Sequence, residues 1–346
     1  MHVSIMLAGY GHVGRGFTDL LLAERQRIYD SLGILFSVVG VADAGGAALC
    51  SQGFPLSKLH TVAWDTGSVA HYPEYGRPSM SALEAIKQSQ AHILVECTPS
   101  NFDTAEPACS YVLHALSCGM HVVLANKGPL ALRWNEIHAY AQSKARRLEF
   151  SAAAAAGLEI VALMSALGSA EDIASFRGVL NATSQFVLDL WLKGKPQDEA
   201  VRLAQEMGIA EADPSFDLGG FDTAVKLLAL ANAAGSGGMS LSDVHIQGVE
   251  ALTSNMLLEA SSSNGRIALL GVGTANRLAK GGFDLSVAPH VLAPDDPLAQ
   301  LSYQDKAVQI FTHSRGMQLL VGRGMNMDGT AGSVLSDVVR IARTMS

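Results

Sequence analysis

The sequence predicts an α/β protein with a Rossmann-type doubly wound sheet at its N-terminus, followed by an α+β domain. Three observations predict this fold. A short apolar run at residues 3–8 leads directly into a glycine-rich turn and a helical segment. Further apolar runs then alternate with helical segments, which is typical of a parallel sheet. Beyond residue 150 the strand-like runs favour an antiparallel or mixed sheet.

The composition excludes several classes of protein. Of 346 residues, 49% are hydrophobic and 16% charged, so the chain can bury two cores. A net charge of −8 argues against nucleic acid or an anionic membrane as a partner. No apolar run is long enough to span a bilayer, and no basic leader precedes the first strand. The cysteines form no C-x-x-C pair, so we expect reduced thiols in a cytoplasmic protein.

The first turn carries the pattern G-x-G-x-x-G between a strand and a helix, where dinucleotide binding requires it. The first glycine allows the tight turn, the second lets the backbone approach a pyrophosphate, and the third lets helix and strand pack closely. The helix N-terminus then holds the anion. The alternative, a purely structural turn, is disfavoured by this placement. The residues expected to contact the cofactor here are Gly9, Tyr10, Gly11, His12, Val13 and Gly14.

The second strand, residues 35–42, ends at Asp43. A carboxylate there accepts the ribose hydroxyls of NAD and repels the 2′-phosphate of NADP. No arginine follows it, so we expect NAD or NADP with NAD slightly favoured. A simple turn residue is the alternative interpretation of Asp43. Residues 51–80 are expected to form loops and short helices without assignable chemistry.

Two more strands end in polar residues, at the edge where a doubly wound sheet meets its ligand. Residues 91–97 lead into Thr98, Pro99 and Ser100, which we expect to contact the cofactor. Residues 120–125 lead to Lys127, which we expect at the nicotinamide end of the crevice. A solvated loop lysine is the alternative for Lys127.

Residues 211–226 gather carboxylates and one amine around proline and glycine turn signals. Asp222 and Lys226 lie four apart on a helix expected to begin near Phe221, so they share one face. Such groups beside a nucleotide domain suit binding an amino acid and protonating a carbonyl. The alternative is an exposed pair that stabilises the helix by about 0.3–0.5 kcal/mol.

The chain resembles homoserine dehydrogenase nearly end to end. The A-x-x-x-G-x-A-E-A-D-P segment with D-x-x-G-x-D-x-x-x-K-L is far more specific than the glycine turn. The matching segments are residues 8–14, 125–129, 180–183, 204–214, 217–227 and 322–337.

The resemblance implies reversible reduction of aspartate 4-semialdehyde to homoserine with NAD(P)H, a small-molecule substrate and a homodimer. It implies a dinucleotide-binding domain at 1–150, completed by 314–346, and a substrate-binding and dimerisation domain at 151–313. By position, Lys226 gives the aldehyde oxygen its proton, Asp222 orients substrate and lysine, and Lys127 sits between nicotinamide and substrate. The substrate-binding residues are Glu211, Asp217 and Thr183, and Gly324 touches the cofactor together with Thr98.

Two departures from the family pattern affect these expectations. Ser151 stands where the family often has a carboxylate that ligates a monovalent cation, so we expect no metal. Ala182 replaces a glycine after Asn181, which removes a residue that tolerates positive φ, so the substrate loop is expected to shift. Two alternatives remain at this point: a related dehydrogenase of another short amino or oxo acid, and a nucleotide-binding homologue without turnover.

Overall fold

The computed structural model describes residues 1–170, 173–235, 238–323 and 328–345. The chain forms two compact units, unit 1 (Met1–Gly157 with Asn326–Ser346) and unit 2 (Leu158–Met325). The expected boundaries at 150 and 314 therefore shift. The second shifts because strand β13 (Gly316–Gly322) pairs with β12 (Lys306–Thr312) in the sheet of unit 2. Among the described residues, no helix is long and apolar enough to cross a membrane.

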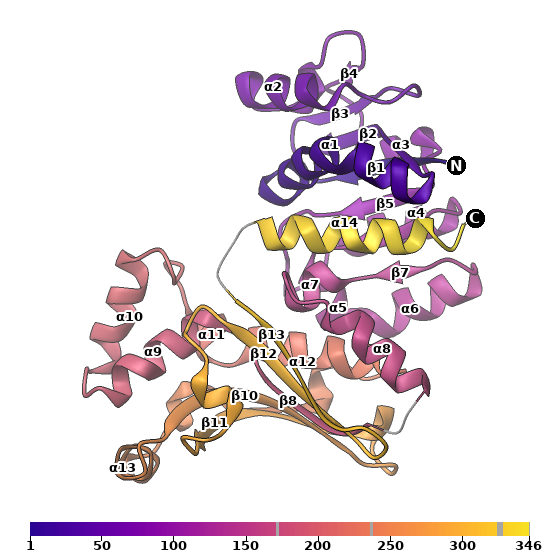
Figure 1. Ribbon diagram of the computed structural model, residues 1–346. Coiled ribbons are helices and arrows are strands. Elements are labelled where there is room, and N and C mark those ends of the chain that lie inside the picture. The colour runs from indigo at the N-terminus through magenta and orange to yellow at the C-terminus, as the bar shows by residue number, and fades with distance from the viewer. Residues whose placement is uncertain (171–172, 236–237, 324–327, 346) are drawn as a thin grey trace. The chain divides into compact units, whose positions relative to one another are not determined.

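Unit 1 is built on a seven-stranded sheet in the order β4-β3-β2-β1-β5-β6-β7 (Figure 1). Strands β2, β1, β5, β6 and β7 are parallel to their neighbours. Strands β3 and β4 extend the sheet beyond β2 and pair antiparallel. This confirms the predicted doubly wound sheet, whereas β4 lies in a segment where we expected only loops and short helices. The strands are β1 (His2–Ala8), β2 (Leu35–Asp43), β3 (Gly46–Leu49), β4 (Gly76–Arg77), β5 (Ile93–Glu96), β6 (His121–Leu124) and β7 (Leu148–Glu149).

Helices cover both faces of this sheet, which explains why β1 is buried along almost its whole length. Helix α1 (His12–Leu32) packs against the C-terminal α14 (Asp328–Ala342), as Figure 1 shows. The other helices are α2 (Leu56–Thr66), η1 (Val69–His71), α3 (Ala82–Ser89), α4 (Ala108–Ser117), α5 (Lys127–Leu132), α6 (Trp134–Ser143) and α7 (Ser151–Ala155).

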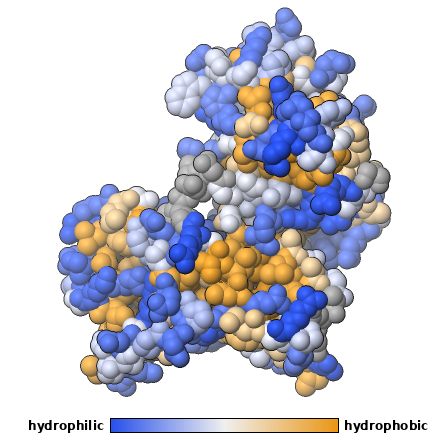
Figure 2. Space-filling model, in the orientation of Figure 1, coloured by the Kyte–Doolittle hydropathy of each residue, from blue (hydrophilic) through white to orange (hydrophobic). Residues whose placement is uncertain are grey.

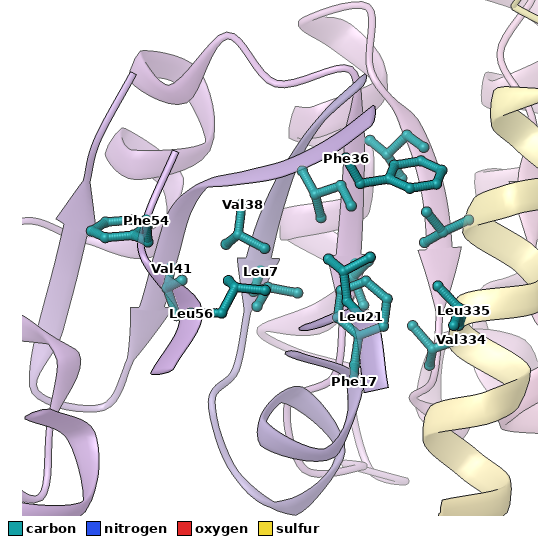
Figure 3. Packing of buried hydrophobic residues seen from close by; sticks show 14 of the residues in the cluster. Leu7, Phe17, Leu21, Phe36, Val38, Val41, Phe54, Leu56, Val334 and Leu335 are labelled. Atoms are coloured by element: carbon teal, nitrogen blue, oxygen red, sulfur yellow. The ribbon is translucent and has the colours of Figure 1, made fainter. Parts of the chain in front are cut away.

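The core of unit 1 joins residues from distant parts of the chain (Figure 3). Leu7 of β1 and Val38 of β2 point toward Phe17 of α1, and Val334 of α14 completes the cluster. All four are at most 1% exposed. Since burial of one such side chain stabilises the fold by about 1.5–3 kcal/mol, the C-terminal helix is an integral part of unit 1.

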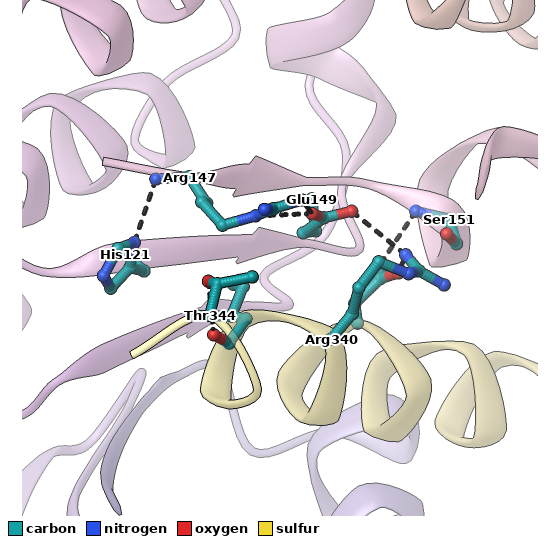
Figure 4. Close-up of polar contacts among 8 residues, drawn as sticks. His121, Arg147, Glu149, Ser151, Arg340 and Thr344 are labelled. Atoms are coloured by element: carbon teal, nitrogen blue, oxygen red, sulfur yellow. Dashed lines mark hydrogen bonds and ion pairs between the residues drawn. The ribbon is translucent and has the colours of Figure 1, made fainter. Parts of the chain in front are cut away.

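An ionic network also ties α14 to the rest of unit 1 (Figure 4). Arg340 bonds Glu149 of β7 at 3.0 Å and Asp337 of its own helix at 2.7 Å. Asp337 is fully buried and accepts the backbone N–H of Ser151 at 2.8 Å. Burial and the nearby Glu149 raise the pKa of the Asp337 carboxyl to about 7, against the opposing effects of Ser151 and Arg340.

Unit 2 is built on a mixed sheet in the order β13-β12-β8-β10-β11-β9, as the sequence predicts. All its pairings are antiparallel except that of β9 with β11. The further strands are β8 (Ile173–Val179), β9 (Val244–Ile246), β10 (Arg266–Ala275) and β11 (Phe283–Leu292). The helices are α8 (Ile160–Ala170), α9 (Ala182–Leu192), α10 (Gln197–Glu206), α11 (Ser215–Leu218), α12 (Phe221–Ala233), η2 (Leu241–Asp243), η3 (Val249–Ala251), α13 (Ser254–Ser262), η4 (Lys280–Gly282) and η5 (Pro297–Gln300).

Helix α12 lies against one face of this sheet, and glycine makes the close approach possible. A Cβ at Gly271 of β10 would lie 3.3 Å from side-chain atoms of Thr223 and Leu227. On the same face Phe176 and Phe283 pack edge to face, with ring centroids 5.3 Å apart. The buried α12 therefore places its polar residues at fixed positions relative to the end of β8.

Candidate active site

The glycine turn of unit 1 has the geometry of a dinucleotide cradle. Gly9 has φ +97°, and a Cβ there would lie 2.6 Å from the carbonyl oxygen of Cys97. A Cβ at Gly14 would lie 2.6 Å from the Gly9 oxygen, so α1 can pack on the turn only because residue 14 is glycine. A Cβ at Gly11 would meet open space, which leaves room for a pyrophosphate. Gly11 also caps α1 without a side chain, so the first N–H groups face that space.

A cavity of about 1170 Å³ opens beside this turn, entirely within unit 1. The tips of β1, β2 and β5 meet at it, as expected for the ligand edge of a doubly wound sheet. Of the residues predicted to contact the cofactor, those around this cavity are Gly9, Tyr10, Gly11, His12, Val13, Asp43, Thr98, Pro99 and Ser100.

The remaining predicted cofactor residues are placed differently. Gly14 is buried beneath the turn and does not line the cavity. Lys127 begins α5 and does not itself line the cavity. Its backbone N–H donates to the hydroxyl of Ser100, a lining residue, at 3.1 Å. Gly324 lies outside the described residues.

Asp43 is held by hydrogen bonds from two loops. Its Oδ1 accepts the Gly45 N–H at 2.8 Å and the Ser68 hydroxyl at 2.7 Å, and its Oδ2 accepts the Val69 N–H at 2.8 Å. The carboxylate therefore anchors the segment after α2, where the sequence assigned no chemistry, and still lines the cavity. Both interpretations of Asp43, turn residue and ribose acceptor, are compatible with this geometry, because Oδ2 has a lone pair left.

Several lining residues were not foreseen. Arg15 follows the third glycine and donates to the Tyr10 carbonyl at 3.1 Å. Asn101 and Tyr111 come from the segment after Ser100 and from α4. The only sequence signal for them was proximity to a predicted strand end, and it does not tell which side chains turn inward.

The candidate substrate groups of unit 2 form a connected cluster. Lys226 Nζ donates to the carboxylate of Asp222, one helical turn earlier, and to the Leu180 carbonyl oxygen at 2.8 Å. Lys226 is 8% exposed and Asp222 3%, so the exposed-pair alternative is wrong. The amide of Asn181 donates to Asp222 at 2.8 Å and to Asp217 at 2.7 Å. Asn181, which was not among the predicted residues, thus links Asp217 to the Asp222–Lys226 pair.

Asn181 is the residue that sequence reasoning did not assign to the site. Its Oδ1 accepts the Ser184 N–H at 2.8 Å, so it is the N-cap of α9 while its amide binds the two carboxylates. An asparagine before a helical segment is a capping signal, but that signal does not predict that the amide also binds two carboxylates. Ala182 is the first residue of α9, so no positive φ is needed there and the expected shift of the loop loses its physical reason.

The other two predicted substrate residues, Thr183 of α9 and Glu211 of the loop after α10, are linked through Ile209. Thr183 is buried, and its hydroxyl donates to the Ile209 carbonyl at 3.0 Å. Glu211, two residues further on, is exposed. Thr183 therefore holds the loop that carries Glu211, and its own oxygen is engaged in doing so.

No group of three or more His, Cys, Asp or Glu side chains in the described part of the chain could hold a metal ion. Ser151, where the resemblance implied the loss of a cation-binding carboxylate, is buried with its backbone N–H bonded to Asp337.

A dinucleotide cradle in unit 1 and a buried ammonium–carboxylate cluster in unit 2 define a nicotinamide-dependent oxidoreductase. Comparison with known families is specific. Residues 9–151 match the family described as homoserine dehydrogenase, NAD binding domain, and residues 160–339 match homoserine dehydrogenase. The chain belongs to the homoserine dehydrogenase family and is an NAD(P)-dependent oxidoreductase acting on homoserine.

Individual relatives match along almost the whole chain. A homoserine dehydrogenase of Methanocaldococcus jannaschii is 33% identical over 98% of both chains. An NAD(+)-dependent homoserine dehydrogenase of Pseudomonas canavaninivorans is 33% identical over 97% of this chain and 95% of that one. The structure of a hyperthermophilic archaeal homoserine dehydrogenase in complex with NADPH covers 99% of this chain and 98% of its own, with 26% identity and a TM-score of 0.83. The alternatives of drifted specificity and of a silent homologue are not favoured by these matches.

Proposed function

We propose that the chain interconverts aspartate 4-semialdehyde and homoserine, with Lys226 exchanging the proton of the reacting oxygen. The observation that carries this assignment is the buried ammonium of Lys226, held between a carboxylate and a backbone carbonyl. When bound, the nicotinamide cofactor supplies or accepts the hydride. In reduction, Lys226 Nζ donates its proton to the aldehyde oxygen as the carbonyl carbon receives the hydride. In oxidation, the neutral amine takes the proton back.

Asp222 and Asn181 keep Lys226 in position for this step. The carboxylate of Asp222 stabilises the ammonium before transfer, and the amide of Asn181 fixes the carboxylate and joins it to Asp217. Because each of these groups is anchored by a second hydrogen bond, little reorganisation is needed as charge develops. Asp217 then lies at the border of the cluster, where its second oxygen suits a substrate ammonium or hydroxyl.

The remaining roles follow from exposure and charge. Glu211 is an exposed carboxylate suited to the substrate α-ammonium group, and Thr183 keeps its loop in place. Lys127 begins α5 next to the cavity-lining Ser100, which suits a position between nicotinamide and substrate. The cofactor pyrophosphate fits the open space at Gly11, beside the first turn of α1.

We favour NAD over NADP because Asp43 presents a carboxylate to the cavity. A 2′-phosphate beside this group would meet a like charge. Replacement Asp43→Asn keeps the size of the side chain and removes its charge, so the NAD preference should fall by roughly tenfold. Ser68→Ala weakens the loop anchor and retains the charge, so it should keep the preference. Equal NAD preference in Asp43→Asn and the parent enzyme would contradict the assignment.

The central experiment measures homoserine oxidation with NAD and NADP in parallel, by the absorbance of the reduced cofactor. Lys226→Met should lower kcat by about a hundred- to ten-thousand-fold, as expected for loss of a general acid–base group. Lys87→Met, on the exposed surface of α3, is the matched control and should keep full turnover. A folded Lys226→Met variant with near-parental kcat would exclude the proposed role.

A homodimer through the sheet of unit 2 is part of the proposal. The face opposite α12 carries a small apolar cluster that includes Val179, Leu270 and Ala307. It continues onto the edge strand β13, where Met317 is 47% and Leu319 39% exposed. Figure 2 shows the hydrophobic surface in this region. The cluster itself is buried within the chain, whereas the exposed Met317 and Leu319 suit contact with the same strand of a second copy, because such a contact would remove both from water.

Light scattering after size exclusion tests the dimer. Leu319→Glu should shift the protein toward monomer, because it places a charge in the proposed contact. Leu278→Glu is the control, since Leu278 is 98% exposed at the far end of the β10–β11 hairpin. A dimer unaffected by Leu319→Glu would place the interface elsewhere.

We place the protein in the cytoplasm, which the free state of its four cysteines supports.

A further inference from the structure

Glu96 is a fully buried carboxyl group at the end of β5. Its Oε1 accepts the backbone N–H of Thr98 at 3.0 Å and also the Thr98 hydroxyl. Its Oε2 is buried, with no hydrogen-bond partner among the described residues. An acid in this position is costly to bury, and an amide or an apolar residue would avoid the cost. Its presence therefore calls for a function.

The contacts of Glu96 lead to the cofactor site through Thr98 and Asn126. The Asn126 amide donates to the Thr98 hydroxyl at 3.2 Å and to the Thr98 and Pro99 carbonyls at 3.0 and 3.2 Å. Its Oδ1 accepts the Gly128 N–H at 2.9 Å, which caps α5. Thr98 and Pro99 line the cavity, and α5 begins with Lys127.

We propose that Glu96 is a positioning residue that couples the cofactor-lining turn Thr98–Ser100 to the start of α5. The ionised carboxylate holds Thr98 with two charge-assisted hydrogen bonds, and Thr98 and Asn126 transmit this order to Lys127. A turn fixed in this way loses less conformational entropy when the cofactor binds. Protonation of Glu96 weakens the two bonds, so cofactor affinity falls at lower pH. This inference rests on the cofactor site proposed above.

The surroundings of Glu96 support titration near neutrality. Burial raises the pKa of its carboxyl to about 7, against the lowering effect of the hydrogen bonds from Thr98 and of the nearby Asn126 amide. The titratable neighbours are Cys97, the next residue in the chain, and Tyr111 on α4, and burial raises the pKa of both. Both therefore stay uncharged at neutral pH. The charged groups on the adjoining segments are Asp103, Glu106 and Lys127.

The test is the dissociation constant of NADH, measured by calorimetry at pH 6 and pH 8 without homoserine. For the parent protein we expect affinity to rise roughly fivefold with pH, because charge-assisted hydrogen bonds are about twice as strong as neutral ones. Glu96→Gln keeps the shape and removes the titration, so its affinity should be independent of pH and equal to that of the parent at pH 6. Glu24→Gln, at a half-buried surface position of α1 that does not line the cavity, should follow the parent at both pH values.

A second pair of variants guards against a folding defect in Glu96→Gln. Thr98→Ser retains the hydroxyl donor and should keep the pH dependence, whereas Thr98→Val removes the donor and should reduce it. The inference is overturned if Glu96→Gln shows the parental pH dependence, or if Thr98→Val and Thr98→Ser behave alike. Failure of the parent protein to bind NADH at either pH would instead refute the proposed cofactor site.

Discussion

Lys226 and Asp222 should be strongly coupled in stability, because neither charge has access to bulk water. Lys226 is 8% exposed and Asp222 is 3% exposed. Removing one partner of a buried ion pair leaves an uncompensated charge and costs about 3–5 kcal/mol. In Asp222→Ala the ammonium keeps the Leu180 carbonyl and loses the carboxylate, and in Lys226→Met the carboxylate keeps the Asn181 amide and loses the ammonium. Each single substitution should therefore destabilise unit 2 by about 3–5 kcal/mol.

The double variant Asp222→Ala/Lys226→Met should be no less stable than either single variant. It leaves no buried charge at the pair, so the two losses should not add, and the interaction free energy should reach at least about 3 kcal/mol. All three variants should lack homoserine oxidation, which separates the stability of the pair from its chemistry.

Unfolding in urea measures these free energies, and one of the three tryptophans reports on the relevant unit. Trp191 of α9 belongs to unit 2, whereas Trp64 and Trp134 belong to unit 1. Fluorotryptophan NMR separates the three signals, so the unit 2 transition can be followed alone. Losses that add to within about 0.5 kcal/mol would refute the picture of a mutually compensating buried pair.

Three further predictions concern unit 1. Gly11→Ala should leave thermal stability unchanged and weaken NADH binding, because its Cβ would occupy open space in the cradle. Gly14→Ala should instead lower the melting temperature, because its Cβ would lie 2.6 Å from a carbonyl oxygen. The Glu96 pKa of about 7 is above the usual 4.5, so its contribution to stability is present at low pH and is lost as pH rises through 7. Glu96→Gln should thus abolish a decline of about 3 kcal/mol in unfolding free energy between pH 4 and pH 8. Asp337→Ala should cost about 2–3 kcal/mol and increase amide exchange in α14, because the Ser151 N–H loses its acceptor and Arg340 loses one of its carboxylate partners. Unchanged exchange would contradict that role.

The sequence by itself determined the architecture of unit 1 and the chemistry of the cluster on α12. A strand, three spaced glycines and a helix can satisfy their backbone and packing requirements in few ways, so the cradle at Gly9, Gly11 and Gly14 was predictable. Spacing of four residues placed Asp222 and Lys226 on one helical face. These features depend on neighbours in the chain, and local rules describe such neighbours well.

Only the tertiary structure decided the partners that come from distant segments. Burial of Lys226 depends on α12 packing against the sheet of unit 2, and an i, i+4 pair looks the same in a sequence whether it is buried or exposed. Asn181 reaches two carboxylates some forty residues away, Ser68 anchors Asp43, and Glu96 is enclosed between neighbouring strands. Strand β13 joined unit 2 because its edge pairs with β12. Each of these outcomes depends on long-range packing, which sets desolvation and hydrogen-bond partners and leaves no periodic trace in the sequence.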